Sequence, residues 1–109
     1  MKNYVITIMD NERSIRAAER CIKSGATVGG MHIEHWKATT PRDDVYQIAK
    51  REGINTSLID EVYSRTSNCL AAFLSHYSLW KHCVELNQEL TIFEHDAVCV
   101  NNINSQIVY

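Results

Sequence analysis

The fold of this chain is indicated first by residues 90–97, which read LTIFEHDA. The apolar run at 90–93 has no polar alternation, which is typical of a strand buried on both faces in a parallel sheet. The run leads directly into Glu94, His95 and Asp96. Because α/β folds bind ligands at the carboxyl ends of their parallel strands, we expect these acids to point into a ligand crevice.

The chain before this strand alternates strand-like and helix-like patterns. A β-branched apolar run predicts a strand at about residues 3–9, followed by an N-cap at residues 10–11 and a helix that ends at Gly25. A second strand is predicted at about residues 28–36, entered through a flexible glycine pair. Strands that alternate with helices indicate an α/β fold with a mainly parallel sheet and flanking helices.

Further helices are predicted between the second and third strands. Thr40, Pro41 and Asp43 form a capping pattern that predicts a helix from Thr40 to Glu52. A weaker capping pattern predicts a short helical turn at residues 57–60. A longer helix is predicted at about residues 68–88, and its packed face is expected to contain Cys69, Phe73, His76, Trp80 and Cys83.

Length and composition limit the class of protein. The 109 residues, 45% hydrophobic and 22% charged, predict one globular domain spanning 1–109. A net charge of −2 lacks the basic excess of a nucleic-acid-binding protein, so no nucleic-acid partner is expected. The apolar run at residues 4–9 is too short for a transmembrane segment and precedes no cleavage pattern, so a cytoplasmic location is predicted.

The four cysteines, at positions 21, 69, 83 and 99, contain no C-x-x-C pair. They lie within apolar patterns and are interpreted as reduced core thiols. Cys69, His76 and Cys83 recur every seven residues, but one straight helix cannot surround a zinc ion with ligands two turns apart. We therefore interpret these three side chains as packing residues.

The acids at residues 94 and 96 have two interpretations from their position alone. Two carboxylates one residue apart at a strand end suit a hard divalent cation that also holds a diphosphate. Acids also end strands as turn formers and helix caps, with no ligand at all.

Several motifs together resemble glycosyltransferase family 25, whose members carry a Ser-His pair, a following Leu-Trp, and an apolar strand that ends in Glu-Asp-Asp. These features correspond to Ser75-His76, Leu79-Trp80 and residues 92–96. Upstream, residues 4–8 with Asn11 and Arg13 resemble the opening strand of the family and its Arg-bearing turn, and residues 34–38 match the end of its second strand. The resemblance covers nearly the whole chain.

The chain departs from the family pattern at two places. His95 replaces the middle acid of the motif, and Ala71-Ala72 replaces the usual Gly-Cys. Because the resemblance puts metal coordination mainly on the last acid, Asp96 remains the principal expected ligand, with Glu94 beside it. The histidine leaves the coordination and the choice of metal open.

The resemblance implies a Rossmann-like, GT-A type domain, here a truncated half, that binds a nucleotide-sugar donor such as a UDP-hexose. The implied acceptor is a glycan of lipooligosaccharide or a similar molecule. The implied cofactor is a divalent metal, Mn²⁺ or Mg²⁺, held by Glu94 and Asp96. Expected contacts to the nucleotide are Asn11, Arg13, Trp36 and Lys37.

Some of these residues keep a second interpretation. Arg13 is equally expected on a solvated surface or against a phosphate, and Trp36 either closes the core or stacks on a base, with the core favoured. No general base is identified, so the isolated chain is expected to transfer little or no sugar. The alternative function is a non-catalytic, truncated α/β module that self-associates and binds nucleotide weakly or not at all. Self-association is expected because half a sheet exposes an edge and an apolar face.

Overall fold

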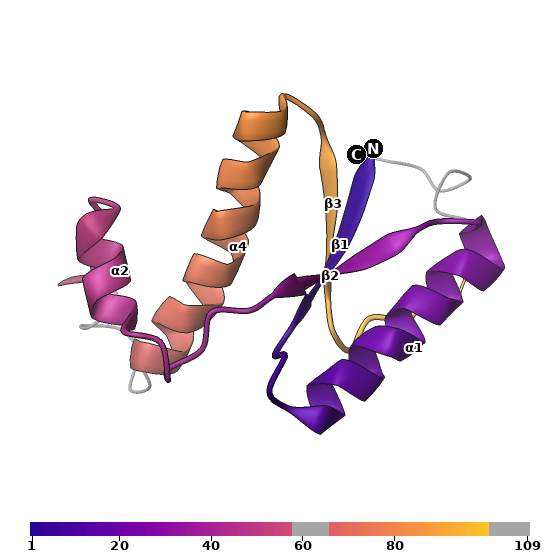
Figure 1. The fold of residues 1–109 in the computed structure, drawn as a ribbon, viewed down its shortest axis with the longest axis horizontal. Helices are drawn as coiled ribbons and strands as arrows, with labels where there is room; N and C mark the ends of the chain where they lie inside the picture. Colours follow the sequence, from indigo (N-terminus) through magenta and orange to yellow (C-terminus); the bar gives the residue numbers. More distant parts are fainter. Residues whose placement is uncertain (58–65, 101–109) are drawn as a thin grey trace. The chain divides into compact units, whose positions relative to one another are not determined.

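The computed structural model describes residues 1–57 and 66–100, and the chain divides into two compact units (Figure 1). The sheet unit comprises Met1–Lys37 and the residues from Leu86 onward, and the helical unit comprises Ala38–Glu85. Within the described ranges, no helix is long and apolar enough to cross a membrane. Each unit has its own apolar core.

Three parallel strands form the sheet unit, in the order β2-β1-β3. β1 (Lys2–Thr7) pairs with β2 (Ile33–Lys37) on one side and with β3 (Leu90–Glu94) on the other. The predicted α/β fold with a parallel sheet is confirmed, and the first and third strands lie close to their predicted ranges. The second strand begins later than predicted because the preceding helix is longer than expected.

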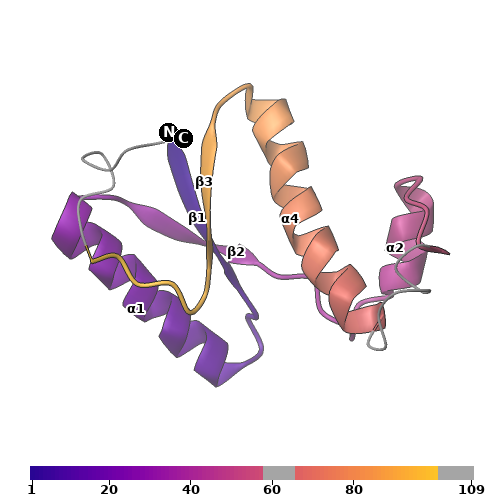
Figure 2. The ribbon, with the colours of Figure 1, turned by 180° about the vertical axis from the view of Figure 1, so that it is seen from behind.

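That helix, α1 (Glu12–Gly29), connects β1 to β2 and lies along one face of the sheet (Figures 1 and 2). Its predicted start is confirmed, because the side chain of Asn11 caps it by accepting a hydrogen bond from the backbone N–H of Ser14 at 3.0 Å. The predicted end at Gly25 is wrong. The helix ends at Gly29 and is capped by Gly30, whose φ of 60° is left-handed and suits glycine.

Gly25 is instead a packing residue inside α1. A Cβ atom at this position would lie 2.5 Å from Cδ1 of Ile33 in β2. The missing side chain therefore lets the helix approach the second strand closely, and only glycine fits without moving Ile33. This close approach, rather than helix termination, explains the glycine.

The core between α1 and the sheet is small and closely packed. Val5 and Ile33 contribute from the sheet and Ala18 and Cys21 from α1, and all four are at most 2% exposed. Burial raises the pKa of the Cys21 thiol, and the nearby Cys99 adds to the shift, so the thiol stays neutral. All four cysteines are free, but only Cys21 is buried in the core, whereas Cys69, Cys83 and Cys99 are partly exposed.

The helical unit contains α2 (Val45–Arg51) and α4 (Thr66–Leu86), which pack side by side. Its core consists of Val45, Ala49, Leu70, Ala71 and Leu74, all at most 3% exposed. Removing such side chains from water contributes about 1.5–3 kcal/mol for each leucine or valine. The short turn predicted at residues 57–60 falls largely on residues outside the described ranges.

The predicted helix start at Thr40 is wrong, although the capping pattern there does form hydrogen bonds. The Thr40 N–H donates to the Asp43 carboxylate at 2.9 Å, and the Asp43 N–H donates to the Thr40 carbonyl at 2.9 Å. These bonds close a turn instead of a helix. α2 begins after Asp44, whose side chain accepts from the Gln47 N–H as N-cap.

The long helix predicted at 68–88 is confirmed as α4, but its predicted packed face is wrong in part. The buried stripe consists of Leu70, Leu74 and Leu79 with Ala71 and Ser75, whereas Trp80 is 49% exposed and Val84 79% exposed. Phe73 lies on the predicted face and does pack against the helical core. The helix is apolar on more than one side, so its periodicity alone did not select the buried face.

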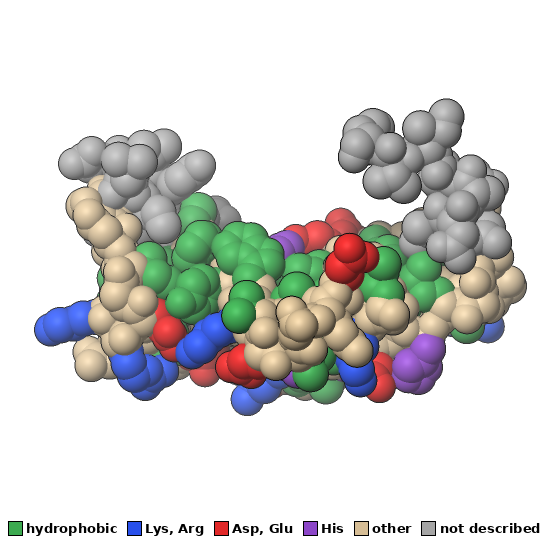
Figure 3. Space-filling model, turned by 90° about the horizontal axis from the view of Figure 1, so that it is seen from above, with side chains coloured by type: hydrophobic (Ala, Val, Ile, Leu, Met, Phe, Trp, Pro, Cys, Tyr) green, Lys and Arg blue, Asp and Glu red, His purple; other side chains and the backbone are tan. Residues whose placement is uncertain are grey.

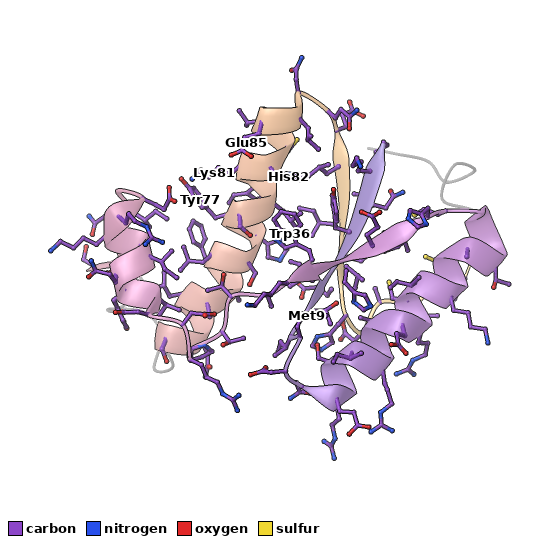
Figure 4. The ribbon with its side chains drawn as sticks, in the orientation of Figure 1. Met9, Trp36, Tyr77, Lys81, His82 and Glu85 are labelled. Carbon is purple, nitrogen blue, oxygen red and sulfur yellow. The ribbon has the colours of Figure 1, made fainter. Side chains whose placement is uncertain are left out.

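An ion pair joins the end of α2 to α4. The carboxylate of Glu52 accepts from Lys81 Nζ at 3.0 Å and from the Tyr77 hydroxyl at 3.4 Å. Figure 4 shows Tyr77 and Lys81 on the side of α4 that faces α2. Charges are otherwise mixed, since Lys and Arg side chains are interspersed with Asp and Glu on the face shown in Figure 3.

Candidate functional site

The strand order puts two chain segments together at one edge of the sheet. The chain passes from β1 to β2 on one side and then returns to β3 on the other side of β1. In doubly wound sheets, ligands bind outside the carboxyl ends of the strands where the order reverses in this way. At that point lie the exit of β1, at residues 8–11, and Glu94, His95 and Asp96 at the end of β3.

The exit of β1 turns directly into the first turn of α1. Asn11 N–H donates to the Ile8 carbonyl at 3.0 Å, and the Asn11 side-chain oxygen is used by the cap. The side-chain nitrogen Nδ2 of Asn11 makes no hydrogen bond with the described residues and is thus available to a ligand. Arg13 is exposed in the first turn and makes no hydrogen bond or ion pair within the part of the chain that is described.

Ser14 ties this turn to the end of β3. Its hydroxyl oxygen is 2.9 Å from the Ile8 N–H and 2.9 Å from Nδ1 of His95, and the residue is only 3% exposed. One buried hydroxyl therefore links the exit of β1, the first turn of α1 and the middle of the acidic motif.

A second hydroxyl–imidazole pair lies beside it. Oγ1 of Thr7, which is fully buried, is 2.8 Å from Nδ1 of His35 and donates to the Val5 carbonyl at 3.2 Å. Thr7 is the last residue of β1, and His35 is on the neighbouring β2. Both hydroxyl–imidazole pairs are thus at the carboxyl half of the sheet.

Glu94, the last residue of β3, lies on the sheet face opposite to the one that α1 covers. It pairs in register with Ile6, whereas Val5 and Phe93 pair on the face covered by α1. His95 and Asp96 form a turn after the strand, and Nδ1 of His95 contacts Ser14 in the first turn of α1. Glu94 and Asp96 are both exposed. A hydrogen bond of 3.0 Å from the Ala97 N–H to the Glu94 carbonyl closes a turn that contains His95 and Asp96.

The two carboxylates are the oxygen ligands that the edge offers to a cation. Among the described residues, no group of three or more His, Cys, Asp or Glu side chains could hold a metal ion. Any cation bound by Glu94 and Asp96 would thus need further ligands from its substrate or from water.

Trp36 and Lys37 lie at the end of β2. Trp36 pairs in register with Ile6, so it shares a sheet face with Glu94, and its ring packs edge-on against Tyr4 with centroids 5.3 Å apart. Trp36 is half-buried. Lys37 is exposed, and it lies opposite Thr7 in the register of β2 with β1.

The Ser-His motif lies in the helical unit and has a structural environment. Ser75 is 2% exposed, accepts from the Thr39 N–H at 2.9 Å and reaches the Ala71 carbonyl at 2.9 Å. The Ser75 hydroxyl therefore attaches Thr39, which follows β2 in the chain, to α4. His76 is half-buried and lies 6.2 Å from the Trp80 ring centroid.

A comparison with protein-family models matches residues 1–108 to glycosyltransferase family 25, described as a lipopolysaccharide biosynthesis protein. The chain belongs to glycosyltransferase family 25. No curated protein and no solved structure matches it. Family membership supports a glycosyltransferase-like role in lipopolysaccharide biosynthesis, with sugar donor and acceptor as the expected partners.

The sequence did not lead us to predict a role for Thr7 and Ser14, whose hydroxyl groups contact His35 and His95 at the carboxyl ends of the strands. A signal for each was present. Thr7 is a polar residue in phase with the buried Val5, and Ser14 follows the Asn11 cap by three residues, where the helix turns back toward the sheet. His35 likewise falls in phase with the buried Ile33.

Proposed function

We propose that this chain is the donor-binding part of a glycosyltransferase of GT-A type that uses a nucleotide-sugar of the UDP-hexose class. The product would be a glycan of lipopolysaccharide or lipooligosaccharide. The observation that carries the proposal is the location of the family's acidic motif. Glu94 is the last residue of β3 and Asp96 comes two residues later, at the reversal of strand order where open α/β sheets bind ligands.

The ligand chemistry of this edge fits a hard divalent cation, Mg²⁺ or Mn²⁺. Exposed carboxylate oxygens suit both ions, and these ions usually take remaining ligands from water and substrate phosphates. We assign Asp96 as the principal ligand and Glu94 as the second. A bound cation would neutralise the charge that develops on the leaving nucleoside diphosphate.

The other residues of the edge have separate roles in this proposal. The guanidinium of Arg13 is exposed in the first turn of α1, where it can pair with a phosphate in a bidentate way. The open part of the Trp36 ring, on the face that holds Glu94, offers a stacking surface for the base. The Asn11 amide and the Lys37 ammonium supply further donors.

The experiment is a calorimetric titration of the protein with UDP, with and without Mn²⁺. We expect affinity that increases with the metal, and Asp96→Asn should weaken the metal-dependent affinity by about tenfold or more, with the melting temperature nearly unchanged. Asp43→Asn is the matched control, because Asp43 is an exposed acid of the helical unit. Equal UDP affinities for wild type and Asp96→Asn would show that the metal is bound by other residues or that no metal takes part in UDP binding.

The same titration separates the proposal from its alternative, a non-catalytic α/β module, which would show no metal-dependent UDP affinity. Direct sugar transfer also requires a base that takes the proton from the acceptor hydroxyl. Because we assign no such base, we expect the isolated chain to bind UDP-hexose with little or no transfer. Self-association stays a prediction, to be tested by light scattering.

A further inference from the structure

The hydrogen bonds of Ser14 determine which nitrogen of His95 carries the proton. A backbone N–H can only donate, so the Ser14 oxygen accepts from Ile8. The one hydroxyl hydrogen of Ser14 then needs an acceptor. Within residues 1–57 and 66–100, the only acceptor that the hydroxyl contacts is Nδ1 of His95, at 2.9 Å.

Neutral His95 therefore carries its proton on Nε2, because Nδ1 accepts from Ser14. Nε2 has no partner among the described residues, and no side-chain nitrogen or oxygen in that part of the chain is both buried and unpartnered. Nε2–H is consequently open to solvent. The middle position of the acidic motif thus presents a fixed hydrogen-bond donor where the family pattern has a carboxylate.

The neighbouring pair shows that this outcome is specific to Ser14. The Thr7 hydroxyl donates to the Val5 carbonyl and must therefore accept from Nδ1–H of His35. Neutral His35 thus has a lone pair, and not a proton, on Nε2. The two imidazoles are anchored alike but have opposite tautomers, because Thr7 has a carbonyl to donate to and Ser14 has none among the described residues.

We propose that Nε2–H of His95 donates a hydrogen bond to a phosphoryl oxygen of the nucleotide diphosphate, and that Ser14 is the residue that positions it. The inference rests on the proposed function. Phosphoryl oxygens only accept hydrogen bonds, and Glu94 and Asp96 cannot donate one when ionised. A donor between the two acids therefore gives the diphosphate a protein contact that does not pass through a metal.

One consequence separates this chain from a site with three acids. Part of the affinity for UDP should persist when the divalent metal is removed by a chelator. With an acid at residue 95, the diphosphate would instead meet a third negative charge and would depend fully on the metal. His95→Asp should thus abolish UDP binding in EDTA and retain binding in Mn²⁺.

The deciding experiment is UDP titration in EDTA and in Mn²⁺ with two substitutions of His95. His95→Asn keeps an acceptor for the Ser14 hydroxyl but has no group at the position of Nε2, so UDP affinity in EDTA should decrease about tenfold with little change in melting temperature. His95→Gln places an amide N–H near Nε2 and should retain most of the affinity. His32→Asn is the control, since that side chain is 84% exposed at the amino end of β2.

The positioning role of Ser14 is measured separately by nitrogen NMR of the imidazoles. Wild type should show His95 protonated on Nε2, and Ser14→Ala should give a mixture of tautomers together with weaker UDP binding in EDTA. Metal-dependent UDP binding with equal affinities for wild type and His95→Asn would overturn this inference and leave the proposed function standing. No UDP binding by the wild type in either buffer would overturn both.

Discussion

The sheet unit and the helical unit use their buried hydroxyl groups differently. In the sheet unit, Ser14 holds an imidazole whose outer nitrogen is open to solvent. In the helical unit, the Ser75 hydroxyl accepts a hydrogen bond from the Thr39 N–H and donates one to the Ala71 carbonyl, so both of these partners are backbone groups. The two halves of the family 25 motif therefore have different surroundings: the acidic half lies at the carboxyl ends of the strands, and the Ser-His half attaches Thr39 to α4.

The largest expected effect tests whether the helical unit is stabilised by its own core. Leu74→Ala removes a 2% exposed side chain from the cluster with Val45 and Leu70, so the free energy of unfolding should fall by about 2–5 kcal/mol in urea denaturation. Val84→Ala on the same helix is the control, because Val84 is 79% exposed and should change stability by less than about 0.5 kcal/mol. Equal effects of the two substitutions would show that α4 packs by a different face.

A smaller effect tests whether Ser75 only stabilises the helical unit and takes no part in UDP binding. Ser75→Ala leaves the Thr39 N–H without its acceptor, and we expect a loss of about 1–3 kcal/mol in stability. UDP affinity of the folded protein should not change. Ser78→Ala on the same helix is the comparison variant: it removes a hydroxyl that donates to the Ser75 carbonyl and leaves the bond from the Thr39 N–H to Ser75 in place. A clear loss of UDP affinity in folded Ser75→Ala would break the comparison, because the Ser-His half would then take part in binding.

The sequence predicted the sheet unit better than the helical unit, for a physical reason. The strand that ends in Glu94, the cap at Asn11 and the parallel sheet all depend on local patterns or on strand alternation. The turn at Thr40 and the buried face of α4 depend on which neighbour each segment packs against. A capping pattern and an apolar stripe permit several such arrangements.

The organisation of the candidate site could be predicted only in part. Glu94 and Asp96 were identifiable from their position after a buried strand. The contact between Ser14 and His95 joins residues that are 81 positions apart, and it exists only because β3 pairs with β1 in one register. A shift of that register by one residue would turn His95 to the opposite face and bring an acid against Ser14.

The smallest expected effect concerns the ion pair that links α2 to α4. The hydrogen bond from Lys81 lowers the pKa of Glu52, and the same bond raises the pKa of Lys81. The stabilisation from Glu52 is therefore present at neutral pH and is lost as the pH falls through its lowered folded pKa. The contribution of Lys81 is present below its ordinary pKa and is lost as the pH rises through its raised folded pKa.

The melting temperatures of wild type and Glu52→Gln, compared from acid to strong alkali, measure how much the Glu52–Lys81 ion pair stabilises the protein. Because the Lys81 side chain is 52% exposed and solvent screens the attraction, we expect wild type to melt only slightly higher at neutral pH, with the difference reduced by added salt. The difference should close in acid, where Glu52 is protonated, and it should also narrow in strong alkali. Lys81→Met should reproduce the neutral-pH effect. A difference that persists in acid and in high salt would mean that Glu52 acts through packing at the end of α2, and the helical unit would then owe its stability to apolar contacts alone.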